Sequence, residues 1–417
     1  MTASRNRSRP RLALALCAGA LLMGGASTAL ARDLEPVPSA DDTPIATAPP
    51  EQTQPQPSAE PQAAPVKQKW THLFVDDQDG MPDFSKVLAR GGFIPVPIII
   101  TEPAVGNGGG LAAAFLSASP DHPREISRSV VGAFKTSNGS DGVILFHSGY
   151  AMDGRLSYRA GVGHGKVTLE SFPGFAPGGI EYTSHYDYGL LASALWDLGG
   201  GFSVGPLFDF RKLSMEVDIQ GLPQSFTDQF SEKMRTGAMG LGFHYDGRDN
   251  PLTPTTGGNA YIEGKFNSQI FGSQRDYQEY DAAGYAFGKL SSRFRYGLKL
   301  ELNAIRGNYP VYYAPAINLR GVQALRYQGM ETYSTETELT WQANPRWALL
   351  AFGGVGQSYA DSARLYKDSG AIWTGGVGFR YRLARKFGFD AGADIAWGPD
   401  GATFYIQFGH AWSFKMD

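Results

Sequence analysis

The amino-acid sequence predicts an all-β protein: a closed transmembrane antiparallel β-barrel of about 16 strands, preceded by a short N-terminal helix and a disordered linker. Three observations favour this fold class. From about Phe93 to Phe414, segments of about ten residues alternate apolar and polar side chains. Glycine and aromatic residues are frequent, whereas charged residues make up 18%, less than the usual quarter. Beyond the N-terminus, no window offers the roughly 18 apolar residues that a membrane-spanning helix needs.

The N-terminus has the features of a secretory signal peptide, which we assign to residues 1–31. A basic start is followed by an apolar, small-residue stretch, and Ala29 and Ala31 fit a small-x-small cleavage site. The alternative, a membrane-anchor helix, is disfavoured by the many alanines and glycines. The only cysteine, Cys17, lies in this segment, so we expect no disulfide or cysteine-based zinc site in the mature chain. Residues 32–69, rich in proline, alanine and glutamine, are predicted to be a disordered linker.

Residues 70–91 are predicted to contain a short helix. Asp83 is suited to cap its N-terminus, and Phe84, Val87 and Leu88 then share one face. A helix of this length is not stable alone. We therefore expect the segment to dock on or in the domain that follows, although the sequence does not say whether it fills the barrel or lies at the membrane surface.

Residues 92–417 form the predicted barrel domain. Phe294 and Tyr296 fall on one face of a strand, and Lys299 and Glu301 fall on the other. Alternation over about ten residues is typical of transmembrane barrels, which face lipid outside and polar groups inside, whereas strands of soluble sandwiches usually have 5–6 residues. The predicted strands are 93–102, 108–119, 127–138, 141–152, 154–170, 180–197, 201–219, 236–247, 258–271, 277–288, 294–306, 331–343, 346–358, 371–384, 386–397 and 402–413.

Two motifs are more specific than the alternation. One is HYDGRDNP at 244–251, and the other is LRGV at 319–322, which contains Arg320 and Gly321. The second motif lies in a connection that runs from 303 to 329, and long connections in compact β proteins are usually functional. The guanidinium there either stays in solvent or folds into a polar interior and pairs with a carboxylate.

The order and spacing of these motifs, three strands apart with five strands to follow, resemble the BamA/TamA-type outer-membrane assembly-factor family, also known as the bacterial surface antigen family. The resemblance covers nearly the whole barrel domain. It implies that Arg320 enters the lumen and pairs with Glu338 on the next strand, with help from Asp246 or Asp249 of the first motif. A second carboxylate expected one strand later is absent, because Gly354 stands where an acid often sits.

The resemblance also implies a function, which is not enzymatic. It suggests a bacterial outer-membrane barrel that assists the insertion or translocation of proteins or lipids. The expected partners are the lipid bilayer, unfolded outer-membrane proteins or lipids, and the barrel assembly machinery that would insert this chain itself. Members of the family usually carry periplasmic POTRA-type domains before the barrel, and residues 32–90 are too few for them, so we expect a member without them. The net charge of −3 argues against a nucleic-acid partner.

We expect the function to depend on a weak seam between the first and last strands. Pro95 and Pro97 lack backbone donors and would pair poorly with a neighbouring strand, unless both prolines precede the barrel. Gly409 and Trp412 belong to a pattern in the last strand that is similar to an outer-membrane targeting signal. Such a seam would part laterally or disturb the bilayer beside it.

Two other functions remain open. A passive diffusion pore or transporter requires an open lumen. An outer-membrane hydrolase requires a serine that meets one of the histidines near predicted strands, His147, His164 or His185. No cofactor or metal is expected. The run GVGHGK at 161–166 lacks the first glycine and the final serine or threonine of a phosphate loop, and Asp77-Gln-Asp79-Gly80 lacks the other ligands of a calcium loop.

Overall fold

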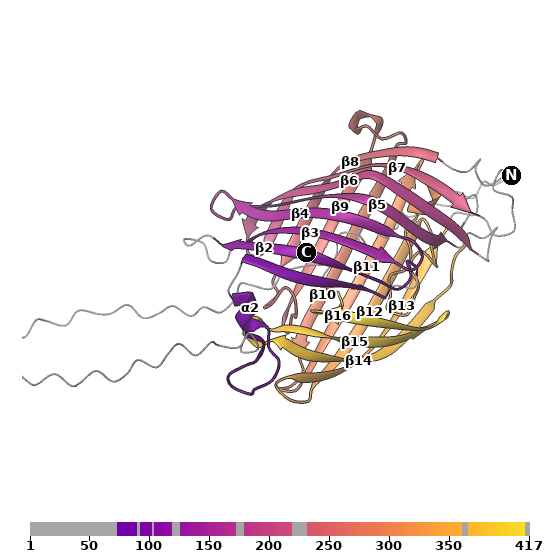
Figure 1. The fold of residues 1–417 in the computed structure, drawn as a ribbon. Coiled ribbons are helices and arrows are strands. Elements are labelled where there is room, and N and C mark those ends of the chain that lie inside the picture. The colour runs from indigo at the N-terminus through magenta and orange to yellow at the C-terminus, as the bar shows by residue number, and fades with distance from the viewer. Residues whose placement is uncertain are drawn as a thin grey trace, which may run out of the picture.

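The computed structural model describes residues 73–89, 92–101, 104–118, 126–171, 179–218, 232–360 and 366–412; the predicted signal peptide and linker lie outside them. Within these residues, sixteen antiparallel strands form one sheet in chain order, which curls into a barrel (Figure 1). The predicted fold class and strand number are confirmed. The strands are β1 Gly92–Ile100, β2 Gly108–Ala118, β3 Ile126–Thr136, β4 Asp141–Ala151, β5 Leu156–Ser171, β6 Ile180–Gly199, β7 Phe202–Asp218, β8 Glu232–Asp246, β9 Gly257–Asn267, β10 Tyr277–Lys289, β11 Phe294–Gly307, β12 Glu331–Gln342, β13 Trp347–Tyr359, β14 Ile372–Ala384, β15 Phe389–Gly398 and β16 Gly401–Phe408.

Helices are short in the described part of the chain. The α-helix α2 spans Ser85–Ala89, and three 3₁₀ turns span Gln269–Phe271, Val311–Tyr313 and Arg385–Phe387. Asp83 precedes α2, and its carboxylate accepts a hydrogen bond from the backbone N–H of Ser85 at 2.6 Å. None of the helices in these residues has the length and apolar character needed to cross a membrane.

The strand faces divide the side chains as a transmembrane barrel requires. On β11, Leu298 and Leu300 are 47% and 45% exposed, whereas the intervening Lys299 and the following Glu301 are each 3% exposed. Lys299 and Glu301 form an ion pair with a 3.5 Å separation. The exposed face is thus apolar and the buried face is charged, the reverse of a soluble protein and the arrangement expected for lipid outside and polar groups inside.

The two ends of the barrel differ in their connections. Connections from odd to even strands gather at one end and include the longest, 308–330 between β11 and β12. Connections from even to odd strands lie at the other end and include 200–201, 290–293 and 343–346. We call these the long-loop end and the short-turn end. In Figure 1, α2 lies at the short-turn end, beside the last strands drawn in yellow.

The first and last strands lie on the same side of the barrel in Figure 1. Strand pairing runs in order from β1 to β16, and the described residues include no β1–β16 pair. The predicted barrel is thus nearly closed. Pro95 and Pro97 lie within β1, opposite Ala113 and Leu111 of β2, so they do not precede the barrel. Without an N–H, each proline removes a donor from the strand edge.

Candidate functional site

The connection 308–330 folds inward as an irregular hairpin. The backbone N–H of Ile317 donates to the Tyr327 carbonyl at 3.0 Å, and that of Val322 donates to the Leu319 carbonyl at 3.1 Å. Ile317 and Leu319 are 2% and 4% exposed and pack with Ile372 of β14. These contacts place Arg320, which is buried, at the tip of the loop inside the barrel.

Arg320 is surrounded by carboxylates from two strands. Its Nε donates to Glu336 Oε1 at 2.9 Å and its Nη2 to Glu338 Oε2 at 2.8 Å, both on β12. Its Nη1 donates to Asp394 Oδ2 on β15 at 2.9 Å. The guanidinium also lies 3.5 Å from the ring centroid of Phe352 on β13, a cation–π geometry. The arginine therefore binds the loop to three strands at once.

The charges of this cluster are nearly balanced. Arg380 of β14 also donates to Asp394, at 2.5 Å, so two guanidinium groups face the carboxylates of Glu336, Glu338 and Asp394. Buried charges are tolerated only when each is paired and hydrogen-bonded. Removing either arginine would leave more buried negative charge than positive charge in the cluster. The cluster is therefore expected to hold the loop in one position.

Gly321 allows the loop tip to approach the last hairpin. Its φ is +91°, a region that side chains rarely adopt, and a Cβ there would lie 3.1 Å from backbone atoms of Trp397 on β15. Its N–H donates to the Tyr405 hydroxyl on β16 at 3.0 Å. The Arg320-Gly321 pair therefore contacts both strands that end the barrel.

Asp246 and Asp249 do not help to hold Arg320, and this part of the prediction is wrong. Asp246 pairs with Arg248, whose Nη2 lies 2.6 Å from Asp246 Oδ2. Asp249 accepts hydrogen bonds from the backbone N–H groups of Thr255 and Thr256 at 2.8 and 3.1 Å. Both carboxylates thus stabilise their own turn at the short-turn end, while Arg320 reaches the lumen from the long-loop end.

Glu336 and Asp394 occupy the positions around Arg320 that were predicted for Asp246 and Asp249. The sequence indicates that both residues face the lumen, because each lies on the polar face of an alternating strand. The sequence around them does not indicate which polar residue faces the loop. Gly354 has a different role from the missing acid. A Cβ there would lie 2.8 Å from Leu319, so the glycine leaves room for the loop.

The C-terminal segment leaves the sheet and enters the lumen. β16 ends at Phe408, so the predicted last strand, 402–413, is too long. Gly409 turns the chain with a φ of +75°, and its N–H donates to the Asp390 carbonyl at 2.7 Å. The N–H of His410 then donates to the Leu252 carbonyl in the β8–β9 turn at 2.6 Å. The residue that follows the first motif therefore contacts this segment.

Trp412 ends this segment on the far wall of the lumen. It is 4% exposed and packs on Tyr285 and Phe287 of β10, with ring centroids 6.1 and 5.9 Å away. Its indole Nε1 donates to Glu336 Oε1 at 2.8 Å, the carboxylate that also binds Arg320. We call residues 409–412 the inner tail. Glu336 links the inner tail to the loop.

At the short-turn end, residues 73–89, which we call the strap, bind the last hairpins. The guanidinium of Arg346 in the β12–β13 turn binds Asp76, Asp79 and Asp83 at 2.5, 2.6 and 2.7 Å. Arg385 in the β14–β15 turn adds a 2.8 Å contact to Asp76. The strap precedes β1 in the chain, but it contacts the β12–β13 and β14–β15 turns, which lie on the β16 side of the seam. The chain therefore crosses the seam between the strap and β1.

Acid should release the strap. Hydrogen bonding to Arg346 lowers the pKa of Asp79 from 3.8 to about 2, and hydrogen bonds that outweigh burial lower that of Asp83. A lowered folded-state pKa contributes stability above the unfolded value, and this is lost as the pH falls through the folded value. We expect a spin label at Gln78→Cys, in a Cys17→Ser background, to be immobile above pH 5 and to become mobile between about pH 4 and 2.

A label at Ser292→Cys in the β10–β11 turn provides the matched control, since it lies at the same end of the barrel and away from the strap. Equal mobility changes at both positions would indicate general unfolding, and an unchanged label at Gln78→Cys down to pH 2 would contradict the role of the carboxylates.

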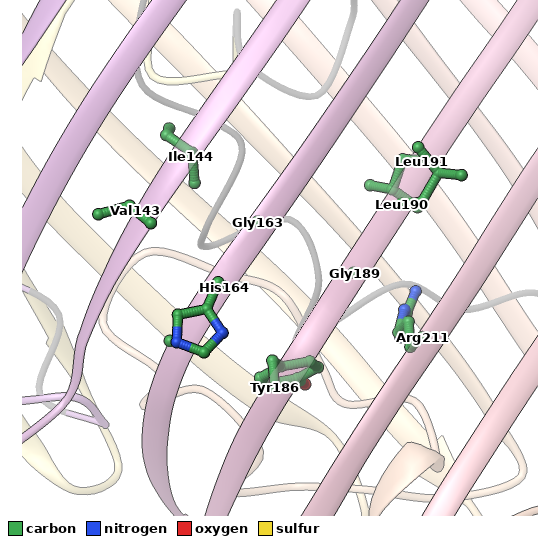
Figure 2. A pocket seen from close by; sticks show the side chains of 10 residues that line it. Val143, Ile144, Gly163, His164, Tyr186, Gly189, Leu190, Leu191 and Arg211 are labelled. Atoms are coloured by element: carbon green, nitrogen blue, oxygen red, sulfur yellow. The ribbon is translucent and has the colours of Figure 1, made fainter.

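A crevice interrupts the barrel wall where the β5–β6 and β6–β7 registers shift. Figure 2 shows His164, Tyr186 and Arg211 around it. The residues that line it include no serine or carboxylate; they are Val143, Ile144, Gly163, His164, Gly165, Tyr186, Gly189, Leu190, Leu191 and Arg211. His164 Nδ1 lies 3.1 Å from the Asp187 carbonyl. The crevice thus offers no serine to the histidine that lines it.

One histidine does meet a serine. Ser129 Oγ lies 2.9 Å from His147 Nδ1, and His147 Nε2 lies 3.4 Å from the Tyr158 hydroxyl. Ser129 sits in the middle of β3, paired with both β2 and β4. The backbone N–H groups around it belong to these ladders and do not converge as an oxyanion hole would require. His185, the third candidate, lies 3.4 Å from Glu216. The geometry does not favour hydrolysis.

The fold and this lumenal site define the class of protein: a sixteen-stranded transmembrane barrel with a loop anchored inside it. No family model matches the sequence, and no curated protein matches it. The structure is similar to BamA from Haemophilus ducreyi lacking POTRA domains 1–3, with a TM-score of 0.54 and 12% identity over 77% of this chain and 70% of that one. It is also similar to CdiB from Escherichia coli, with a TM-score of 0.50 and 12% identity over 75% of this chain and 61% of that one.

These similarities show a shared fold. They confirm at that level the resemblance to the BamA/TamA-type barrel that the two motifs indicated. The chain spans about three-fifths of the length of CdiB. At 12% identity, activity and partners are matters for proposal.

Proposed function

We propose that this protein acts in the bacterial outer membrane, where it assists the insertion or translocation of proteins or lipids at the seam between β1 and β16. The observation that carries the proposal is that these two strands do not pair with each other in the part of the chain that the structure describes. Each seam strand has one edge without a strand partner in the described residues, and such edges pair readily with an added strand. A parted seam would also give lipids a path beside the barrel.

The anchored loop supports a role for the seam. Arg320 binds Asp394 of β15, and Gly321 binds Tyr405 of β16. The loop therefore reaches the hairpin that forms one side of the seam. Movement of that hairpin would strain the carboxylate cluster, so the loop is placed to set how easily the seam parts.

The orientation follows from the connections. Outer-membrane barrels have short periplasmic turns and longer extracellular loops, so we expect the short-turn end, and with it the strap, on the periplasmic side of the membrane. An unfolded outer-membrane protein arriving from the periplasm would meet the seam at this end. In this orientation, the loop that carries Arg320 enters from outside the cell.

Reconstituted protein tests the proposal. Urea-unfolded outer-membrane protein is added to liposomes that contain the wild type, Arg320→Ala or no protein, and folding is followed by gel mobility. We expect the wild type to fold its client faster than either control, because only it combines the open seam with the anchored loop. Lipid scrambling is measured on the same vesicles. If the wild type accelerates neither folding nor scrambling, the proposal is wrong.

The lumen argues against the competing function of a diffusion pore. The loop enters it at Arg320, and the inner tail crosses it from β16 to Trp412 on the wall formed by β10. Single-channel recording separates the two functions. Steady conductance by the wild type, without acceleration of folding or scrambling, would support a pore.

A further inference from the structure

The strap has two chemically different edges. Its acidic edge holds Arg346 through three carboxylates, and Arg346 is consequently 4% exposed. Its other edge, as we assign it, is apolar and partly exposed. Four large apolar side chains are between 37% and 40% exposed; they are Phe74, Val75, Met81 and Phe84. Four such residues in one seventeen-residue segment form a cluster of the kind that marks an interaction surface.

Two of these residues are fixed in place. The rings of Phe74 and Phe84 pack edge to face with centroids 5.3 Å apart. The Phe84 N–H donates to the Leu383 carbonyl at the end of β14, at 2.8 Å. The apolar edge is thus held by the barrel in a defined position, and its exposure is not a product of a loose segment.

The strap meets the barrel at the border of its lipid-facing surface. The Tyr381 hydroxyl donates to the Pro82 carbonyl at 2.7 Å. Tyr381 packs on Trp347, with centroids 4.9 Å apart, and Trp347 also packs on Phe379. Trp347 and Phe379 are 39% and 41% exposed and belong to the outward, apolar rows of β13 and β14. Aromatic residues at the ends of such rows mark the boundary between hydrocarbon and headgroups.

We infer that the strap is a membrane-interfacial anchor whose apolar edge inserts into the lipid leaflet at the short-turn end, beside β13 and β14. The partner is the lipid surface itself. Amphipathic segments bury an apolar face about 5–10 Å into the boundary between headgroups and acyl chains and keep the polar face in water. Here the carboxylates face the arginines of the turns, and the apolar cluster continues the lipid-facing surface of the barrel.

Charge complementarity with the turns favours this partner over insertion into the lumen. Asp76, Asp79 and Asp83 all turn toward Arg346 and Arg385 of the barrel. The four apolar side chains take no part in these ion pairs and remain 37–40% exposed. A lipid leaflet beside β13 and β14 would cover them without any movement of the strap.

Two single-cysteine variants of the full chain test the inference. Both carry Cys17→Ser; one adds Met81→Cys on the apolar edge, and the other adds Gln78→Cys on the polar edge as the matched control. Each is labelled with an environment-sensitive fluorophore and reconstituted in dioleoylphosphatidylcholine vesicles. Folding is checked by heat-modifiable gel mobility. Quenching is compared between aqueous iodide and phospholipids that carry a nitroxide on the acyl chain.

We expect the probe at Met81→Cys to lose most of its emission to the nitroxide lipid and little to iodide, and the probe at Gln78→Cys to show the opposite. Equal quenching of both by iodide would overturn the inference and leave the apolar edge free for a protein partner. Equal quenching of both by the nitroxide lipid would overturn the two-edged arrangement. The experiment contains no client protein, so its failure is distinct from failure of the proposed function.

Discussion

Arg320→Ala is expected to lower the free energy of unfolding by about 3–5 kcal/mol, the range found when one partner of a buried ion pair is removed. The substitution leaves Glu336, Glu338 and Asp394 close together, with Arg380 paired to Asp394 and His410 3.3 Å from Glu338. Repulsion should drive the loop out of the lumen. Unfolding in urea, measured by tryptophan fluorescence in detergent, and protease cleavage within 308–330 report both effects.

Two further variants make this test specific. Arg320→Lys keeps the charge but cannot form the forked contacts, so it should recover only part of the lost stability. Arg326→Ala lies in the same loop, where Arg326 pairs with Asp400 at partly exposed positions, and it should cost at most about 1 kcal/mol. Equal losses of unfolding free energy in Arg320→Ala and Arg326→Ala would show that the lumenal cluster contributes no more to stability than an exposed ion pair.

Trp412→Ala is expected to destabilise the barrel by about 3–5 kcal/mol, as truncation of a buried tryptophan usually does. It removes the packing on Tyr285 and Phe287 and the indole hydrogen bond to Glu336. The inner tail should then detach from the far wall. Urea unfolding gives the stability, and a nitroxide label at Ala411→Cys, in a Cys17→Ser background, gives the mobility of the tail.

Trp373→Ala provides the control, since Trp373 is 69% exposed on the outward face of β14. It removes the same side chain without opening a cavity, and we expect a small change in stability and an immobile tail. Trp412→Phe distinguishes packing from hydrogen bonding, because it keeps most of the ring contact and loses the donor. A tail that remains immobile in Trp412→Ala would refute the anchoring role of this residue.

The barrel could be predicted from the sequence because its signal is local. Alternation of Phe294, Tyr296 and Leu298 with charged residues specifies both the strand and its faces, whatever lies beside it. The number of strands follows by counting such segments. The missing β1–β16 pair is not a local property, because it depends on how two distant strands meet, and the prolines indicated only that one edge lacks donors.

Part of the lumenal site could be predicted from the sequence. Arg320 stands out as an arginine in a long connection, and Glu338 lies on the polar face of the strand that follows. Asp394 does not stand out, because several strands carry acids on their polar faces and only the three-dimensional fold brings this one to the loop. The aspartates of the first motif misled for a physical reason, since short carboxylates in turns commonly satisfy nearby backbone N–H groups.

The two ends of the chain show the same limit. Asp83 and its short helix can be read locally, but its partner Arg346 lies far away in the sequence. The inner tail continues an aromatic, strand-like pattern, and propensity predicts more sheet there. Contacts of Gly409 and Trp412 with residues of other strands decide against it.

The position of Trp412 has a consequence for how copies of this chain compete during biogenesis. The sequence around Gly409 and Trp412 is similar to a targeting signal, and such a signal must be accessible to be recognised. In the finished barrel, Trp412 is enclosed by Tyr285, Phe287 and Glu336. Machinery that recognises this segment would therefore not bind folded copies of the chain. It would remain free to bind newly arrived, unfolded copies.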